Sequence, residues 1–111
     1  MTYARIGETH YAADTAGQIY RAKKGKLVPL KPWDNGQGYQ LVEIYVDKIR
    51  RRSLVHRLVW EAFNGAIPDG LEINHKDRRR ANNALDNLEL LTHRENLNYS
   101  RRLGAWRKDK T

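Results

Sequence analysis

The sequence contains no cysteine among its 111 residues. Disulfide bonds, thiol catalysis and cysteine-ligated zinc are therefore excluded together, and any metal must be held by His, Asn, Asp or Glu. No apolar run approaches the roughly 18 residues that a membrane-spanning helix needs, which argues against a membrane protein. The first eight residues include a glycine and an acid where a secretory signal has an apolar stretch, so we expect a cytoplasmic protein.

Acidic residues are also scarce relative to basic ones. The chain carries 13 Asp and Glu against 21 Lys and Arg, which gives a formal net charge of +8 and a pI of about 10.0. This balance predicts a polyanionic partner, with nucleic acid the first candidate and an acidic membrane surface the second. The basic residues occur in both halves of the chain, most densely at 50–52, 76–80 and 101–108. At 111 residues the chain can bury one modest core, which excludes a large multidomain enzyme.

The first half of the sequence carries the signals of short strands. Residues 15–18 are typical of a turn, and Asp34-Asn35-Gly36 is the strongest turn signal in the chain. Residues 40–46 alternate with the period of two that a strand shows when one face is more buried than the other. The patterns predict a small antiparallel sheet with strands at residues 11–14, 19–22, 40–46 and 49–52.

The apolar period becomes helical after residue 53. One stripe at i, i+3, i+4, i+7 and i+8 contains Val55, Leu58, Val59, Ala62 and Phe63. We expect Ser53 to cap the start of this helix and Asn64-Gly65 to end it.

Two further strands and a second helix are expected after this helix. Residues 71–75 and 88–91 are short enough to be strands, and the loop between them is rich in Arg, Asn and Asp. Thr92 and Glu95 have the spacing of a capping box, at the start of a helix from His93 to about Arg102. The predicted fold class is α+β. Its parts are a small N-terminal antiparallel sheet at 1–52, a helix, strand, loop, strand and helix at 53–100, and a basic C-terminal tail at 101–111.

Amide and histidine side chains gather at the junctions of these later elements. They occur as Asn74-His75, Asn82-Asn83, Asn87 and Asn96, after the stretch 55–63. The spaced pattern, over about residues 53–100, resembles the phage-type HNH endonucleases, including the homing endonucleases. The resemblance implies a ββα-metal motif, in which two strands and a helix hold one divalent cation against a scissile phosphate.

The resemblance also implies roles for particular residues. His75 matches the general base, and an ordinary histidine pKa of roughly 6.5 suits proton removal from water near neutral pH. Asn74 and Asn96 match the oxygen ligands of a hard cation, which implies one Mg²⁺ or Mn²⁺ ion and no zinc. Asn87 matches the asparagine that braces the loop and orients the histidine.

The sequence departs from the family pattern at two places. Asn74 stands where many relatives have Asp, so the two ligands contribute no formal charge, and we expect weak metal affinity without DNA. Leu90-Leu91 stands where a Trp is common in the second strand, which concerns packing more than chemistry.

Other polar residues near the motif have more than one interpretation. His93 lies one turn before Asn96 and is either a phosphate or leaving-group contact or part of the helix cap. For His56 we expect a structural or phosphate contact rather than metal ligation, and for Asp77 a hydrogen bond that braces the loop.

Contacts to DNA phosphates are expected from the basic residues. The candidates are Arg50, Arg51, Arg52, Lys76, Arg78, Arg79, Arg80, Arg101, Arg102 and Arg107, together with His93. The first half is similar, more weakly, to small-sheet modules that precede HNH domains, and Tyr39 or Tyr45 is expected near duplex DNA.

The sequence therefore predicts a metal-dependent endonuclease that acts on double-stranded DNA, in the host cytoplasm if it is phage-encoded. One active site per chain favours a monomer that nicks one strand, although Leu103 and Trp106 offer a dimer contact. A non-catalytic basic DNA-binding regulator stays open as an alternative. An RNA-binding accessory protein fits the charge and the tyrosines but leaves the asparagine pattern unexplained.

Overall fold

The computed structural model describes residues 2–98 of the chain. Several sequence predictions fall outside these residues and have no structural account. They are the tail at 101–111, the end of the last helix near Arg102, the phosphate contacts Arg101, Arg102 and Arg107, and the dimer contacts Leu103 and Trp106. Within residues 2–98, no helix has the length and apolar character to cross a membrane.

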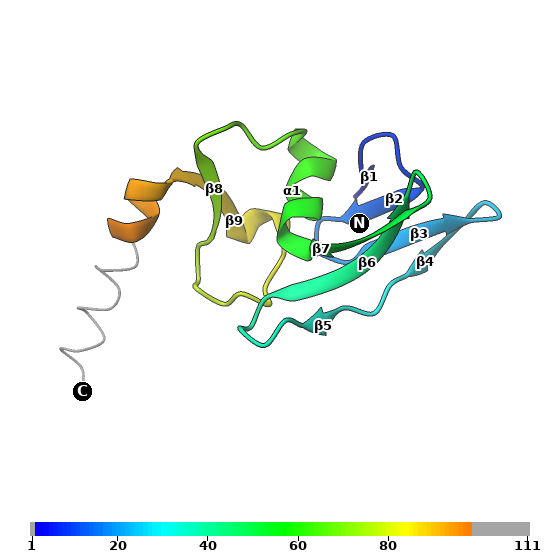
Figure 1. Ribbon diagram of the computed structural model, residues 1–111, viewed down its shortest axis with the longest axis horizontal. Coiled ribbons are helices and arrows are strands. Elements are labelled where there is room, and N and C mark those ends of the chain that lie inside the picture. Colours follow the sequence, from blue (N-terminus) through cyan, green and yellow to red (C-terminus); the bar gives the residue numbers. More distant parts are fainter. Residues whose placement is uncertain (1, 99–111) are drawn as a thin grey trace.

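The N-terminal part of the chain is a four-stranded antiparallel sheet in the order β1-β2-β3-β4 (Figure 1). Its strands are β1 Tyr3–Arg5, β2 Tyr11–Asp14, β3 Ile19–Lys23 and β4 Lys26–Pro29. The predicted turn at 15–18 is confirmed. Asp14 is buried and organises this turn, because its Oδ1 accepts hydrogen bonds from the Ala16 and Gln18 N–H groups at 2.9 and 3.0 Å.

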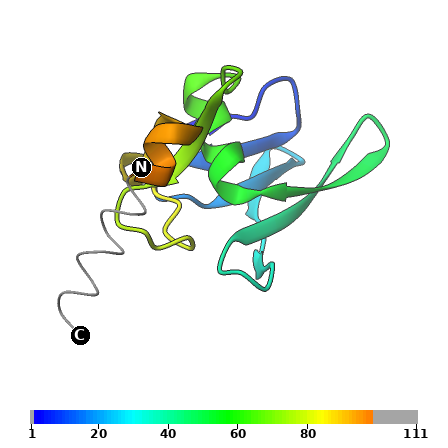
Figure 2. The same ribbon diagram turned by 60° about the vertical axis from the view of Figure 1, so that its left-hand side comes forward.

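A second sheet contains β5 Trp33–Asp34, β6 Gln40–Val46 and β7 Ile49–Leu54, so the strands that the sequence placed in one small sheet divide between two antiparallel sheets. Val42 and Ile44 of β6 are buried, whereas Glu43 and Tyr45 between and after them are exposed, so the predicted alternation is confirmed. The β6–β7 hairpin extends away from the side of the molecule that holds the last helix (Figure 2).

Helix α1, Val55–Asn64, continues directly from β7. The prediction that Ser53 caps it is wrong: the cap position is Leu54, and no side chain caps the helix there. Ser53 lies one residue too early, because it is still paired with Val42 in the β6–β7 ladder. The predicted end is confirmed, since Gly65 has a φ of 80° and its N–H donates to the Glu61 carbonyl at 2.9 Å.

The remaining elements are an antiparallel hairpin and a helical segment. Strands β8 Leu71–His75 and β9 Leu88–Thr92 pair along their length, and a short 3₁₀ helix, η1 Leu85–Asn87, precedes β9. Residues 93–98 are helical. The predicted capping box is confirmed: the Thr92 N–H donates to Glu95 Oε1 at 2.8 Å, and the Glu95 N–H donates to Thr92 Oγ1 at 3.1 Å.

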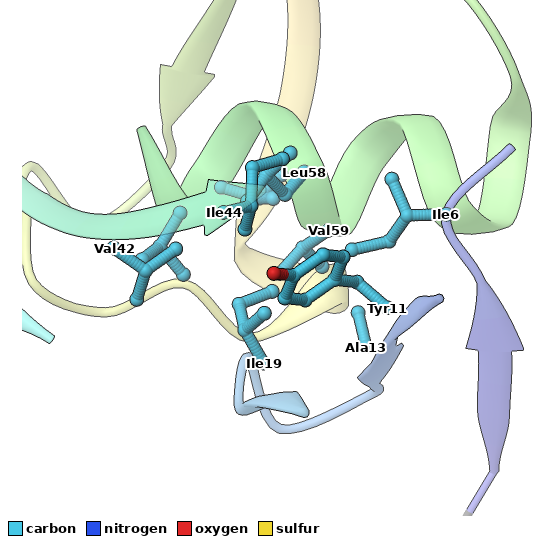
Figure 3. Close-up of a cluster of buried hydrophobic side chains, with 10 residues drawn as sticks. Ile6, Tyr11, Ala13, Ile19, Val42, Ile44, Leu58 and Val59 are labelled. Atoms are coloured by element: carbon cyan, nitrogen blue, oxygen red, sulfur yellow. The ribbon is translucent and has the colours of Figure 1, made fainter. Parts of the chain in front are cut away.

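One buried cluster joins these parts, with α1 at its centre (Figure 3). It contains Ile6, Tyr11, Ala13, Ile19, Val42, Ile44, Val55, Leu58, Val59 and Leu88. Side chains from both larger sheets, from α1 and from β9 therefore pack together. The core fixes the position of the β8–β9 hairpin relative to the N-terminal sheet, across the sequence boundary at 52–53.

Candidate active site

A depression of about 410 Å³ opens beside the β8–β9 hairpin. It is lined by β8, by the loop after β8, by the helical residues 93–98 and by one residue of the segment before β6. The lining residues are Tyr39, Glu72, Ile73, Asn74, His75, Arg78, Arg80, His93, Asn96 and Leu97. The structure thus brings six of the predicted site residues to one place: Asn74, His75, Arg78, Arg80, His93 and Asn96.

His75 is the last residue of β8, and only 6% of its surface is exposed. Its Nε2 lies 3.0 Å from Asn83 Oδ1. A carboxamide oxygen can only accept a hydrogen bond, so Nε2 carries the proton and the lone pair of the neutral ring is on Nδ1. His75 therefore has one basic nitrogen, as a general base requires.

Two further rings pack beside His75. The ring of His56 from α1 meets His75 edge-on, with centroids 4.9 Å apart, and Tyr39 lies 5.5 Å from His56 and 6.1 Å from His75. The Arg80 guanidinium lies 4.7 Å from the centre of the Tyr39 ring and donates to the Gln37 carbonyl at 2.7 Å. The rings limit how the His75 imidazole can turn.

His56 is buried and uncharged at neutral pH. Burial, followed by the neighbouring His75 and Arg57 charges, lowers the pKa of His56 to about 4. Among residues 2–98, its Nδ1 has no hydrogen-bond partner. The sequence left open a structural contact or a phosphate contact for His56. A buried, neutral ring beside His75 fits the structural contact.

Asn74 and Asn96 each donate an amide hydrogen to a carboxylate. Asn74 Nδ2 lies 3.1 Å from Glu89 Oε2, and Asn96 Nδ2 lies 2.9 Å from Glu72 Oε1. Both bonds use the amide nitrogen, so the carboxamide oxygen is the atom left to coordinate a cation. Within the described residues there is no cluster of three His, Asp or Glu side chains that could hold a metal. Amide oxygens, completed by phosphate oxygens and water, fit a hard cation such as Mg²⁺ or Mn²⁺.

Glu72 is a site residue that the sequence analysis missed. Its second oxygen, Oε2, lies 2.9 Å from His93 Nδ1, and the hydrogen bonds from Asn96 and His93 lower the pKa of its carboxyl. Glu72 is two residues before Asn74 in β8, and residues two apart in a strand share a face, so this alternation could have identified it. The sequence analysis considered His93 as part of the cap of the last helix. The side chain that caps this helix is Thr92, and the His93 side chain binds Glu72.

Asn87 and Asp77 brace the loop between β8 and η1. Asn87 Nδ2 donates to Asp77 Oδ1 and to the Asn82 carbonyl, both at 2.9 Å, and Asn87 Oδ1 accepts from the Asp77 N–H at 3.1 Å. Asp77 also accepts from Asn82 Nδ2 and the Arg79 N–H, each at 2.8 Å, and such hydrogen bonds lower the pKa of its carboxyl. Asp77 thus occupies the bracing position expected for it.

The predicted phosphate contacts lie in two separate regions. Arg78 and Arg80 line the depression, and Lys76 and Arg79 are exposed on the same loop. Arg50, Arg51 and Arg52 lie on the exposed part of β7, where Arg50 Nε is 3.7 Å from Glu43 Oε1. Tyr39 belongs to the depression, whereas Tyr45 is exposed on β6, opposite Arg50.

The chain is similar to proteins that are named as HNH endonucleases. Residues 53–98 match the sequence profile of a family described as HNH endonuclease. The chain is 35% identical over 105 residues to YosQ, named as an HNH homing endonuclease of the SPbeta prophage of Bacillus subtilis (strain 168). That alignment covers 94% of this chain and 60% of YosQ. DNA endonuclease I-HmuI of Bacillus phage SP01 is 32% identical over 90 residues, which are 81% of this chain and 51% of I-HmuI.

A solved structure, described as DNA binding and cleavage by the HNH homing endonuclease I-HmuI, has a similar fold. It superimposes with a TM-score of 0.82 at 30% identity, over 94% of this chain and 60% of that chain. The predicted α+β class is confirmed. The chain spans about 60% of YosQ and of the I-HmuI chain in this structure.

Proposed function

Because the chain belongs to the HNH endonuclease family of the phage and homing branch, we propose that it hydrolyses phosphodiester bonds in double-stranded DNA, with one divalent cation. The observation that carries this proposal is the position of His75. Nδ1 is the basic nitrogen of its neutral ring. His75 lines the same depression as Asn74 and Asn96.

His75 would act on the attacking water. Nδ1 would take a proton from the water, and the water oxygen would form a bond to phosphorus. The bond from phosphorus to the leaving oxygen would break, and its electron pair would stay on that oxygen. Asn74 and Asn96 would hold the cation, which when bound stabilises the negative charge on the phosphate oxygens. Glu89 and Glu72 orient these two carboxamides by accepting their N–H groups.

The rim of the depression would hold the DNA backbone. Arg78, Arg80 and His93 line the depression, and the Arg80 side chain is held by the Tyr39 ring and the Gln37 carbonyl. Guanidinium groups bind phosphate oxygens through parallel N–H donors, so a fixed arginine favours one position of the backbone.

The number of strands cut follows from the number of sites. Each chain offers one His75 and one pair of carboxamide ligands, whereas two antiparallel strands require two sites or two binding orientations. We propose that the protein acts as a monomer and nicks one strand. Supercoiled plasmid should then pass first to the open circle. Direct appearance of linear product, together with a dimeric mass in solution, would contradict this proposal.

Plasmid cleavage with Mg²⁺ or Mn²⁺ tests the activity. Excess chelator should abolish cleavage, and His75→Ala should reduce its rate by a factor on the order of 10² or more, with DNA affinity nearly unchanged. Cleavage that persists in excess chelator would remove the metal from the proposal. Loss of DNA binding in parallel with cleavage would make His75 a contact residue instead.

The arginines on β7 support a second candidate function, that of a DNA-binding regulator without catalytic activity. Arg50, Arg51 and Arg52 are exposed on a hairpin outside the depression, so the sheet offers a basic surface independent of His75. A protein that binds duplex DNA but cleaves none in Mg²⁺ or Mn²⁺ would favour this function.

A further inference from the structure

The turn between β2 and β3 touches the loop that follows His75. Gly17 lies in this turn at a φ of +95°, and a Cβ atom built there would meet the Asn83 backbone carbon at 2.6 Å and its carbonyl oxygen at 2.7 Å. Such distances are too short for any side chain, so only glycine lets the two backbones approach in this way. The N–H of Leu85, the first residue of η1, donates to the Thr15 carbonyl at 2.9 Å. This bond attaches the end of the loop to the same turn.

The turn is itself rigid. Both oxygens of the buried Asp14 carboxylate are occupied: Oδ1 accepts from the Ala16 and Gln18 N–H groups, and Oδ2 accepts from the Tyr20 hydroxyl at 2.6 Å. The backbone against which Asn83 rests is therefore fixed by the N-terminal sheet.

Asn83 connects this turn to His75. It is 5% exposed, and its side-chain oxygen lies 3.0 Å from His75 Nε2. A neutral imidazole without this partner can place its proton on either nitrogen, and a proton on Nδ1 would remove the lone pair that accepts a proton. The hydrogen bond that Asn83 accepts from His75 therefore decides which nitrogen is basic.

We propose that the β2–β3 turn is a positioning element for the active site: Gly17 seats Asn83, and Asn83 holds His75 as the Nε2–H tautomer. This inference rests on the proposed function, since it assigns a purpose to the tautomer of the proposed base. Gly17 and Asn83 are positioning residues, because they act on the reaction through His75.

Two glycines provide a matched pair for the test. Gly17→Ala places a methyl group against Asn83 at a positive φ. Gly25→Ala, in the β3–β4 turn, has a similar φ of +76° with nothing within 4 Å of the new Cβ atom. Both variants carry backbone strain, so only the contact with Asn83 separates them. Asn83→Ala removes the acceptor for His75, and Asn83→Asp keeps an acceptor oxygen.

The readouts are the His75 tautomer from the ring ¹⁵N shifts of histidine-labelled protein, and kcat and DNA affinity on a cleavable duplex. The His75 signals are assigned with His75→Ala. Wild type and Gly25→Ala should show Nε2–H. Asn83→Ala and Gly17→Ala should gain Nδ1–H and lose about tenfold or more in kcat, with DNA affinity retained. Asn83→Asp, which keeps an acceptor oxygen, should show Nε2–H as the wild type does.

Nε2–H retained in Asn83→Ala would overturn the proposal, and so would a Gly17→Ala variant with the tautomer and kcat of Gly25→Ala. If Gly17→Ala does not fold, the Asn83→Ala and Asn83→Asp pair still decides the bond to His75. If the wild-type protein cleaves no DNA, the proposed function fails. The ¹⁵N spectra then still show whether Asn83 sets the tautomer, so the two failures are distinguishable.

Discussion

His56 packs its ring against His75 edge-on, with 4.9 Å between the ring centroids and 73° between the ring planes. Both rings are buried, and the side chain of His56 comes from the first turn of α1. A positive charge on His56 would be buried, and it would lie beside His75 and near Arg57. The protein therefore keeps His56 neutral, and this has a consequence for its stability in acid.

Acid should destabilise the fold through His56. The pKa is about 4 in the folded protein and about 6.5 in the unfolded chain, so only the unfolded chain gains a proton as the pH falls from 6.5 towards 4. The free energy of unfolding should fall over this window by up to about 3 kcal/mol, whereas above pH 6.5 His56 should have no effect. Urea unfolding at pH 7 and pH 4.5 measures the loss.

The control for this prediction is a histidine on the surface. His56→Gln should reduce the loss of stability in acid, whereas His10→Gln, at an exposed position, should keep the wild-type pH dependence. Equal pH dependence in wild type and His56→Gln would show that another group is responsible.

Asn87→Ala should damage both stability and cleavage. The substitution removes the partners of the Asp77 N–H, the Asp77 carboxylate and the Asn82 carbonyl in a part-buried place, at a cost of about 1 to 3 kcal/mol. Asn96→Ala should impair cleavage with a smaller change in melting temperature, since Asn96 makes one bond to the half-exposed Glu72. If Asn96→Ala lowered the melting temperature more than Asn87→Ala, Asn96 would be the bracing residue and Asn87 the ligand.

Glu72→Gln should raise the Mg²⁺ concentration that cleavage requires. One carboxylate oxygen accepts from Asn96 and the other pairs with His93 Nδ1, whereas a glutamine side chain offers an acceptor oxygen at only one of these two positions. We expect a severalfold shift in a Mg²⁺ titration of plasmid cleavage. Mn²⁺ binding to the protein–DNA complex, followed by electron paramagnetic resonance, should weaken in parallel.

Glu43→Gln is the matched control, because Glu43 is an exposed glutamate on β6 beside Arg50 and outside the depression. An unchanged Mg²⁺ titration in Glu72→Gln would mean that Asn96 does not need this partner.

DNA affinity should fall steeply with salt. Each phosphate neutralised contributes about −0.9 to the slope of log K against log salt concentration. Arg51→Ala should reduce the steepness by about one such unit and leave the cleavage rate of bound DNA unchanged, because Arg51 lies on β7 outside the depression. Affinity that does not respond to salt would show that the positive charge is not what holds the DNA.

Local patterns in the sequence predicted local structure well. The alternation in β6 and the reciprocal bonds of Thr92 and Glu95 involve neighbours along the chain, so spacing alone is informative. The helix cap was wrongly predicted at Ser53 because strand β7 continues to Leu54. The length of this strand depends on its pairing with β6, which the local sequence does not show.

The sequence indicated part of the candidate site but not the contacts between its residues. Of the spaced asparagines, Asn74 and Asn96 line the depression with His75, whereas Asn83 and Asn87 make hydrogen bonds to His75 and Asp77 beside it. The partners of those residues could not be predicted, because Glu72 with Asn96 and Gly17 with Asn83 are pairs far apart in the sequence. Such contacts exist only once the core has placed the hairpin against the N-terminal sheet.

Strand β7 ends at Leu54 and α1 begins at Val55, so the chain has no loose residue between the arginines of the hairpin and His56. Bending this junction would require breaking backbone hydrogen bonds of the sheet or the helix. The hairpin and the first turn of the helix are therefore joined without an intervening loop. The exposed arginines and the ring that packs against His75 thus belong to one continuous stretch of regular secondary structure.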